Sequence, residues 1–276
     1  MRFARNRSWR RRVADAARSA PARSRELTAA AAAQLDLPWA RTWIAGVARE
    51  NFMRFVLNPV MNHYARRWAD GREKIAGLRG PVILVANHAS HMDTPVILSA
   101  LPRRLRKRTV VAAAADYFYR NRLVASAVSL VFNTTPIDRT GGGLSKTGSH
   151  LDRLLDQGWN LLLYPEGTRS RSGVPGRVRR GAAVLAAAHG LMIVPIKVTG
   201  TRDAMPPGRL WPKRLRASPA ASKRHRITVS FGEPLSPSGD TAELIERLQR
   251  FFDTAGNGAS PYRSPYGRRP QTTAER

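Results

Sequence analysis

A histidine and a carboxylate, His88 and Asp93, are the residues whose types and spacing point most directly to chemistry. They lie in the segment NHASHMDTP, directly after a short apolar run, with four residues between them. A carboxylate at this spacing can fold back to one imidazole nitrogen, which fixes the tautomer and leaves the other nitrogen free to accept a proton. General-base help of this kind increases a rate by roughly 10² to 10⁴. Because Asp93 also suits the first turn of a helix, helix capping is the competing interpretation.

Two later segments also present reactive side chains at the end of an apolar run. The segment NTTPIDR is a second strand-to-loop transition, and its Arg139 offers a guanidinium that can hold a phosphate at two points. A surface ion pair with Asp138 is the competing interpretation. The segment YPEGTRS presents four residues together, namely Glu166, Gly167, Thr168 and Arg169. It combines a hydroxyl acceptor with an anion binder, and its glycine permits close approach of the backbone.

Two further residues stand near these motifs. His91 lies two residues from Asp93, and its side chain is therefore expected to point aside from the pair. Pro195 lies in the apolar run IVPI. Because proline has no N–H to give to a strand ladder, it indicates an edge strand or the start of a strand.

The elements that must position these residues follow an alternating pattern from Gly80 onward. Short apolar runs predict strands at residues 82–86, 109–113, 161–164, 193–198 and 227–231. The other stretches predict helices at residues 93–101, 116–131, 143–157, 176–189 and 240–253. Strands that are apolar throughout and alternate with helices predict an α/β fold, with a mostly parallel sheet flanked by helices on both faces. Ligands bind at the carboxyl edge of such a sheet, where His88 is expected to lie.

The segment before the sheet, residues 38–70, is predicted to be helical and amphipathic. Large apolar residues alternate with Arg along it, and Pro59 is expected to break or kink it. Such a segment suits the interface between bilayer and water, while a helix pair packed on the core is the alternative. The predicted organisation is a basic, largely disordered tail, membrane-associating helices, an α/β domain and a second disordered tail, at residues 1–37, 38–72, 73–253 and 254–276.

The net charge of +28 requires an anionic partner, which can be a nucleic acid, a membrane surface or a phosphorylated substrate. The Arg-rich residues 1–25 are expected to tether the chain to anionic lipid. The absence of Cys excludes disulfides, thiolate metal sites and a Cys nucleophile, and it favours a reducing compartment. No transmembrane helix and no secretory signal are predicted, because the chain lacks an apolar run of about 18 residues and its N-terminus lacks an apolar stretch.

The four segments, in this order and spacing, resemble the motifs of the 1-acylglycerol-3-phosphate acyltransferase (lysophosphatidic acid acyltransferase, PlsC-like) family. NHASHMD resembles its NH-x₄-D motif, TPIDR its second motif, YPEGTRS its FPEGTRS motif and VPI its fourth. The segments RVRRGAAVLA and VSFGEPL extend the resemblance, which covers about residues 80–235. The chain has Tyr164 where the family has Phe, and Val178-Arg179 where the family usually has Phe-Lys.

The resemblance implies an O-acyltransferase that moves a fatty acyl group from acyl-CoA or acyl-ACP to the sn-2 hydroxyl of 1-acylglycerol-3-phosphate, which gives phosphatidic acid. His88 would deprotonate the hydroxyl, and Asp93 would orient the imidazole. The implied substrate-binding residues are Arg139, Lys146, Glu166, Gly167, Thr168, Arg169 and Arg179. No metal, cofactor or covalent enzyme intermediate is implied. The implied location is peripheral or monotopic, on the cytoplasmic face of the cell membrane, where the helices of residues 38–72 would lie.

Two alternatives remain open. Lys146 stands in the segment TGGGLSKTGSH, where the family often has an Arg, so the acceptor can instead be another lysophospholipid or a glycolipid. A basic nucleic-acid-binding protein is the remote alternative. Against it, the Lys and Arg excess is concentrated in the tails and in residues 201–226, without a helix-turn-helix, zinc or RNA-binding motif.

Overall fold

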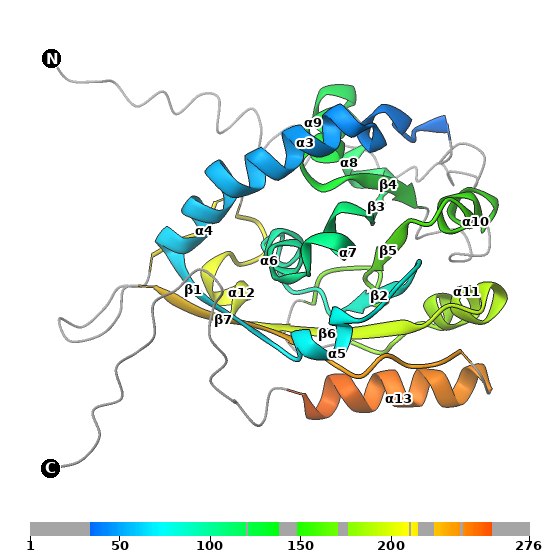
Figure 1. The fold of residues 1–276 in the computed structure, drawn as a ribbon. Coiled ribbons are helices and arrows are strands. Elements are labelled where there is room, and N and C mark those ends of the chain that lie inside the picture. The colour runs from blue at the N-terminus through cyan, green and yellow to red at the C-terminus, as the bar shows by residue number, and fades with distance from the viewer. Residues whose placement is uncertain are drawn as a thin grey trace, which may run out of the picture.

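A computed structural model of the chain describes residues 34–119, 121–137, 148–170, 176–209, 211–214, 224–237 and 240–255. Most of the two predicted tails, including the Arg-rich residues 1–25, lies outside these ranges. Within them, one seven-stranded sheet is covered by helices on both faces (Figure 1). The predicted α/β class is therefore confirmed. No helix in the described ranges is long and apolar enough to cross a bilayer.

The sheet has the strand order β1-β7-β6-β2-β5-β3-β4. Its strands are β1 (Ala65–Asp70), β2 (Ile83–Ala86), β3 (Thr109–Ala114), β4 (Thr134–Ile137), β5 (Asn160–Leu163), β6 (Ile193–Thr199) and β7 (His225–Phe231). The five strands predicted from apolar runs are all present, and the strand-to-loop transition in NTTPIDR is the end of β4. Strand β1 is the one that the apolar pattern does not predict.

The direction of the strands changes once across the sheet. The five strands from β6 to β4 run parallel to one another. Strand β7 is antiparallel to β6, and β1 runs parallel to β7, so these two strands point the opposite way. The sheet is thus mostly parallel, as predicted, and its reversed pair lies at one side.

Helices cover the two faces of the sheet in separate groups. The first group comprises α4 (Asn58–Tyr64), α6 (Asp93–Ala100) and α7 (Arg103–Lys107). The second group comprises α10 (Gly148–Asp156), α11 (Gly181–His189) and α13 (Thr241–Thr254). In β2, Leu84 packs with the first group and Ile83 with the second. This burial on both faces explains why the strands are apolar throughout.

Further helices lie around these two groups. They are η1 (Pro38–Arg41), α5 (Arg72–Ala76), α8 (Ala115–Phe118), α9 (Arg122–Phe132) and α12 (Thr201–Ala204). Asp240 caps the start of α13, because its side chain accepts a hydrogen bond from the Ala242 N–H at 3.1 Å.

A long helical segment crosses the molecule from the β4 side to β1 (Figure 1). It consists of α3 (Trp43–Phe52), the π-helical turn η2 (Met53–Leu57) and α4. Pro59 therefore does not split the segment, because the wider π turn directly before it absorbs the change in hydrogen bonding. The predicted helix over residues 38–70 is too long, since residues 65–70 form β1, where pairing with β7 replaces helical hydrogen bonds.

Pro195 lies in β6, between β2 and β7, so the prediction of an edge strand or a strand start is wrong. Its carbonyl accepts a hydrogen bond from the Gly232 N–H at 2.8 Å, on the side that faces β7. Strand β7 ends at Phe231, so the ladder on this side is finishing at the level of Pro195. An interior strand tolerates the proline because its missing N–H falls between the Ile196–Phe231 pair and the isolated bridge of Ile193 with Leu235, where regular pairing on this side is interrupted.

Candidate active site

His88 and Asp93 form a hydrogen-bonded pair directly after β2, at the carboxyl edge of the parallel strands. The distance from His88 Nδ1 to Asp93 Oδ2 is 2.9 Å. Asp93 is fully buried, whereas the His88 side chain is 18% exposed and can meet a ligand. Because a carboxylate accepts at this position, the imidazole carries its proton on Nδ1 and leaves Nε2 free as a base.

Asp93 does not cap its own helix. It is the first residue of α6, the N-cap position belongs to Met92, and no side chain caps this end of the helix. Asp93 Oδ2 instead turns back and accepts hydrogen bonds from the backbone N–H groups of Ala89 at 2.7 Å and Ser90 at 2.8 Å. The same oxygen thus holds the loop between the two residues of the pair, and the capping interpretation is wrong.

The aromatic ring of Tyr164, at the end of β5, lies against the imidazole of His88. The two ring centroids are 4.1 Å apart and the planes are inclined by 23°. The Tyr164 hydroxyl hydrogen-bonds to Thr94 Oγ1 at 2.7 Å. Burial raises the pKa of the Tyr164 phenol, with the nearby Asp93 charge acting in the same direction. The phenol therefore stays protonated, and the stacked ring limits the rotation of His88.

Glu166 connects the YPEGTRS segment to the loop of the pair. Its Oε1 accepts a hydrogen bond from the His88 backbone N–H at 3.0 Å. In return, the His88 carbonyl accepts one from the Ser170 N–H at 2.7 Å. The geometry gives Glu166 a role in holding the backbone of His88, in addition to any contact with substrate.

The other residues of the YPEGTRS segment continue the loop that holds the His88 backbone. Gly167 has φ of 72°, and a β-carbon there would lie 3.0 Å from Nη1 of Arg179. The guanidinium of Arg179, a predicted binding residue, therefore lies directly over the Gly167 backbone. Thr168 is exposed and Arg169 is partly exposed. These residues can meet a ligand beside His88.

His91 points away from the pair, as predicted. Its ring makes an edge contact with Phe118, with centroids 5.9 Å apart. Burial lowers the pKa of His91 to about 4, and the nearby Arg169 guanidinium and His88 imidazole act in the same direction. His91 is thus neutral at physiological pH, and the influence of Arg169 indicates that this guanidinium lies near the site.

Arg139 and Lys146, two of the predicted phosphate-binding residues, lie outside the described residues. One buried contact to the pair was not predicted from the sequence: the hydroxyl of Thr201, at the start of α12, donates to Asp93 Oδ1. The only signal for Thr201 is its place shortly after the VPI motif, in the segment VTGT. A hydroxyl at that spacing has no chemical signature of its own.

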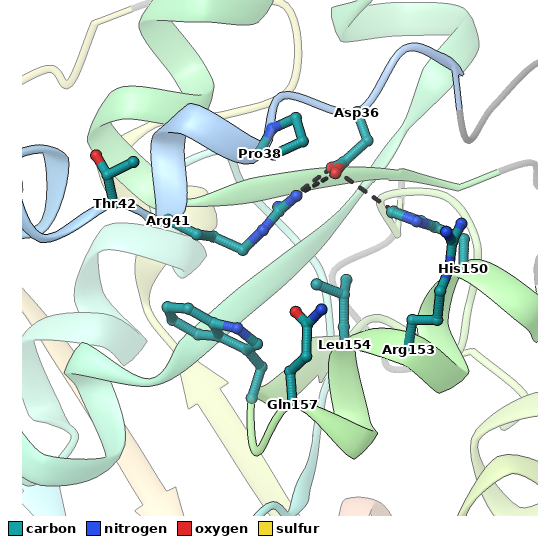
Figure 2. A pocket seen from close by; sticks show the side chains of 9 residues that line it. Asp36, Pro38, Arg41, Thr42, His150, Arg153, Leu154 and Gln157 are labelled. Carbon is teal, nitrogen blue, oxygen red and sulfur yellow. Dashed lines mark hydrogen bonds and ion pairs between the residues drawn. The ribbon is translucent and has the colours of Figure 1, made fainter.

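A pocket of about 470 Å³ lies elsewhere, between η1 and α10 beside the edge strand β4 (Figure 2). Arg41 and His150 both point toward Asp36, which forms an ion pair with Arg41 and lies 3.6 Å from His150 Nε2. Burial tends to raise the pKa of Asp36, but the hydrogen bonds from His150 and Arg41 outweigh burial and lower it. Thr135 of β4 also donates to Asp36 at 3.0 Å. This cluster fastens residues 36–41 over the free edge of the sheet and contains neither member of the His88–Asp93 pair.

The fold and the site together define an α/β protein with a hydrogen-bonded His–Asp pair at the carboxyl edge of its sheet. Residues 60–199 match the family model described as Acyltransferase. This match covers half of the chain, and the chain therefore belongs to the acyltransferase family.

Individual relatives agree with this family. A chloroplastic 1-acyl-sn-glycerol-3-phosphate acyltransferase of Arabidopsis thaliana is 30% identical over 145 residues, which cover 50% of this chain and 37% of the relative. An N-acylphosphatidylethanolamine synthase of the same plant is 32% identical over 167 residues, 56% of either chain. The chain thus spans less than two thirds of these relatives. The crystal structure of the 1-acyl-sn-glycerophosphate acyltransferase PlsC of Thermotoga maritima shares the fold, with a TM-score of 0.55, 20% identity and coverage of 78% of this chain and 79% of that one.

Proposed function

We propose that the protein transfers a fatty acyl group from an acyl-CoA or acyl-ACP thioester to the sn-2 hydroxyl of 1-acylglycerol-3-phosphate, which gives phosphatidic acid. The observation that carries this proposal is the buried Asp93 carboxylate bonded to Nδ1 of the partly exposed His88, in a member of the acyltransferase family. No group on the chain needs to hold the acyl group, because the two substrates react directly.

In the proposed reaction, Nε2 of His88 takes the proton of the acceptor hydroxyl while the hydroxyl oxygen attacks the thioester carbonyl. Asp93 stabilises the imidazolium that forms. The tetrahedral intermediate then collapses, the C–S bond breaks, and the departing thiolate takes the proton from the imidazolium. The products are the new ester and the free thiol of the carrier, and His88 returns to its starting form.

Arg169 and Arg179 are the described cations best placed to hold the phosphate of the acceptor. Arg179 lies over the Gly167 backbone, and Arg169 is close enough to His91 to lower its pKa. Arginine suits this task because its planar guanidinium binds phosphate at two points. Arg139 and Lys146 are proposed to complete the phosphate subsite, and Thr168 is proposed to contact the glycerol portion.

A second acceptor class is supported by one relative. The N-acylphosphatidylethanolamine synthase has a name that refers to an acylated nitrogen, and it is 32% identical to this chain. The His88–Asp93 pair could deprotonate an amine or another lysolipid hydroxyl by the same steps. The identity of the acceptor therefore depends on the phosphate subsite, and a panel of acceptors separates these possibilities.

The deciding experiment is an acyl-transfer assay with purified full-length protein, two donors (acyl-CoA and acyl-ACP) and four acceptors. The acceptors are lysophosphatidic acid, lysophosphatidylethanolamine, phosphatidylethanolamine and the phosphate-free monoacylglycerol. We expect transfer to lysophosphatidic acid and little to monoacylglycerol, because the latter offers nothing to the arginines. His88→Ala should lose roughly 10² to 10⁴ in kcat, the usual contribution of a general base.

The matched control is His63→Ala, which removes an exposed imidazole on α4. It should retain wild-type turnover. Retained turnover in His88→Ala would refute the general-base mechanism. Preferential acylation of phosphatidylethanolamine or of a neutral acceptor would replace the proposed substrate with the alternative one.

A peripheral location at an anionic membrane surface, on the cytoplasmic face of the cell membrane, is proposed as well. Large apolar side chains are exposed along α3 and η2, where Trp43 is 79% exposed, Ile44 70% and Phe55 66%. Leu123, at the start of the neighbouring α9, is 82% exposed. An amphipathic surface with such residues binds at the boundary between headgroups and acyl chains.

Vesicle co-sedimentation tests this location. The double variant Trp43→Ser/Ile44→Ser should bind vesicles of phosphatidylcholine and phosphatidylglycerol at least ~10-fold more weakly, because burying each large apolar side chain contributes roughly 1.5–3 kcal/mol. The control Val184→Ser/Met192→Ser removes two side chains that are 48% and 45% exposed in or next to α11. Equal binding by the first variant and the wild type would refute the location of the membrane-binding surface.

A further inference from the structure

Thr201 touches the His88–Asp93 pair from a part of the chain that lies far away in sequence. It is the first residue of α12, its side chain is 1% exposed, and its Oγ1 donates a hydrogen bond to Asp93 Oδ1. The segment that carries Thr201 follows β6, whereas Asp93 follows β2, and these two strands are neighbours in the sheet. The contact therefore joins two loops at the same edge.

The two oxygens of Asp93 have different partners. Oδ2 accepts from His88 Nδ1 and from the N–H groups of Ala89 and Ser90, at 2.9, 2.7 and 2.8 Å. Oδ1 accepts from the Thr201 hydroxyl. The final torsion of an aspartate is soft, so each hydrogen bond to either oxygen adds to the restriction of the carboxylate plane. Thr201 supplies the donor that holds the second oxygen and so keeps the first directed at His88.

The chain around Thr201 is built to bring it this close. Gly200 has φ of 82°, and a β-carbon there would lie 2.0 Å from the backbone carbonyl oxygen of Arg226 in β7. Only glycine allows the chain to turn against β7 at this point. At the other end of α12, the carbonyl of Met205 accepts a hydrogen bond from the hydroxyl of Ser90 at 2.7 Å. The α12 segment is thus fastened to the loop of the pair at both of its ends.

We propose that Thr201 is a positioning residue for acyl transfer, which fixes the orientation of Asp93 and through it the tautomer and direction of the His88 imidazole. This inference rests on the proposed role of His88 as the general base. Thr201 itself does not contact substrate, so its loss should reduce turnover and leave the affinity for both substrates nearly unchanged.

The experiment compares three variants of the full-length protein with the wild type and His88→Ala. Thr201→Val removes the hydroxyl with little change of shape, Thr201→Ser keeps the hydroxyl, and Thr199→Val makes the same change at an exposed position near the end of β6. For each, kcat and KM are measured for donor and acceptor, the melting temperature is recorded, and ¹⁵N-histidine NMR identifies the nitrogen of His88 that carries the proton. The signal of His88 is assigned by its loss in His88→Ala.

We expect Thr201→Val to lower kcat by about 10- to 100-fold with KM changed by less than about 3-fold, since a donor to a charged group is lost. The Nδ1–H signal of His88 should weaken or move upfield. Thr201→Ser should recover at least about a third of the wild-type kcat, and Thr199→Val should match the wild type. Unchanged kcat and an unchanged His88 signal in Thr201→Val would overturn the proposal, and so would loss of kcat with an unchanged His88 signal.

The same experiment shows separately whether the proposed function is wrong. If His88→Ala retained turnover, or if no acceptor were acylated by the wild type, the general-base chemistry would be wrong. The NMR comparison would still decide whether Thr201 fixes the tautomer of His88, because it does not depend on turnover.

Discussion

At the residue scale, the candidate site is an imidazole, that of His88, which is held by contacts with several residues. Asp93 fixes the His88 ring through Nδ1, the Tyr164 ring lies parallel to it, and Glu166 holds the His88 backbone N–H. The first contact comes from the start of α6, and the other two come from the YPEGTRS segment after β5. The position of Nε2, the nitrogen that would meet the substrate, is therefore set by the fold before any substrate binds.

Substitutions of Glu166 can distinguish a role in holding the His88 backbone from a role in binding the substrate. Glu166→Gln keeps a carbonyl oxygen that can accept the His88 N–H, so kcat should stay within about 5-fold of the wild type. Glu166→Ala removes the acceptor and leaves the partly buried His88 N–H without this partner, so kcat should fall about 10- to 100-fold. Steady-state kinetics with both substrates is the measurement. A large rise in the KM for the acceptor in Glu166→Gln would instead assign the carboxylate charge to substrate binding.

The sequence predicts His88 and Asp93 because the surrounding segments YPEGTRS, TPIDR and VPI complete the resemblance to the acyltransferase family, whereas the spacing of the pair alone also suits helix capping. It does not predict Thr201, because a hydroxyl 108 positions away becomes a partner of Asp93 only when two loops meet at one edge of the sheet. The sequence also does not decide whether the Asp93 side chain caps its own helix or bonds to the preceding loop. A carboxylate in the first turn can bond in either direction, and only the path of the preceding loop decides between them.

At the element scale, α3 is fixed to the rest of the molecule by two charged residues. Arg49 donates to the carbonyls of Leu130 and Ser129, near the C-terminus of α9, at 2.9 and 3.2 Å. Carbonyls in the last turn of a helix carry the negative end of the helix dipole. Burial lowers the pKa of Arg49 to about 10, with Glu50 opposing this, so the guanidinium remains charged near neutral pH. The exposed apolar face of α3 therefore has a set orientation.

Glu50 provides the second attachment and a prediction that depends on pH. Its two oxygens each accept from Arg106 at 2.9 Å. Burial alone would raise the pKa of Glu50, but Arg106 outweighs burial and holds it below the ordinary value of 4.5. The ionised form therefore stabilises the fold above pH 4.5, and this contribution disappears as the pH falls through the lowered pKa.

Glu50→Gln should accordingly reduce the free energy of unfolding by about 1–2 kcal/mol at pH 7, and the difference from the wild type should shrink below pH 4. Urea denaturation at both pH values measures it. The control is Glu246→Gln, on the exposed surface of α13, which should change little at either pH. A loss that is equal at pH 7 and below pH 4 would show that the charge of Glu50 is not the cause.

Helices and strands with a clear apolar pattern can be predicted from the sequence. Elements whose conformation depends on pairing within the sheet cannot. Residues 65–70 contain Arg, Trp and Asp rather than an apolar run, so their pairing with β7 has no local signal. The prediction of an edge strand from Pro195 is wrong for a related reason. The rule that places proline at an edge assumes full pairing on both sides, and in β6 the pairing with β7 is finishing at that residue.

At the scale of the whole molecule, the strand reversal at β6 and β7 determines where the long helix joins the sheet. Thr199, at the carboxyl end of β6, pairs with Thr228 of β7, and Ala65, the first residue of β1, pairs with His225. Strand β1 therefore begins at the edge where β2 and β6 end. Helix α4, which leads into β1, reaches the sheet on the side of His88.

This arrangement has a consequence for how the substrates meet the site. With a fully parallel sheet, the segment before β1 would arrive at the opposite edge, far from His88. In the proposed location, α3 and η2 lie on the membrane. The reversed strands β7 and β1 then place this helical segment and His88 at the same edge of the sheet. An acceptor could then reach His88 by lateral diffusion within one leaflet, without its acyl chain entering bulk water, and its local concentration would follow its mole fraction in the bilayer.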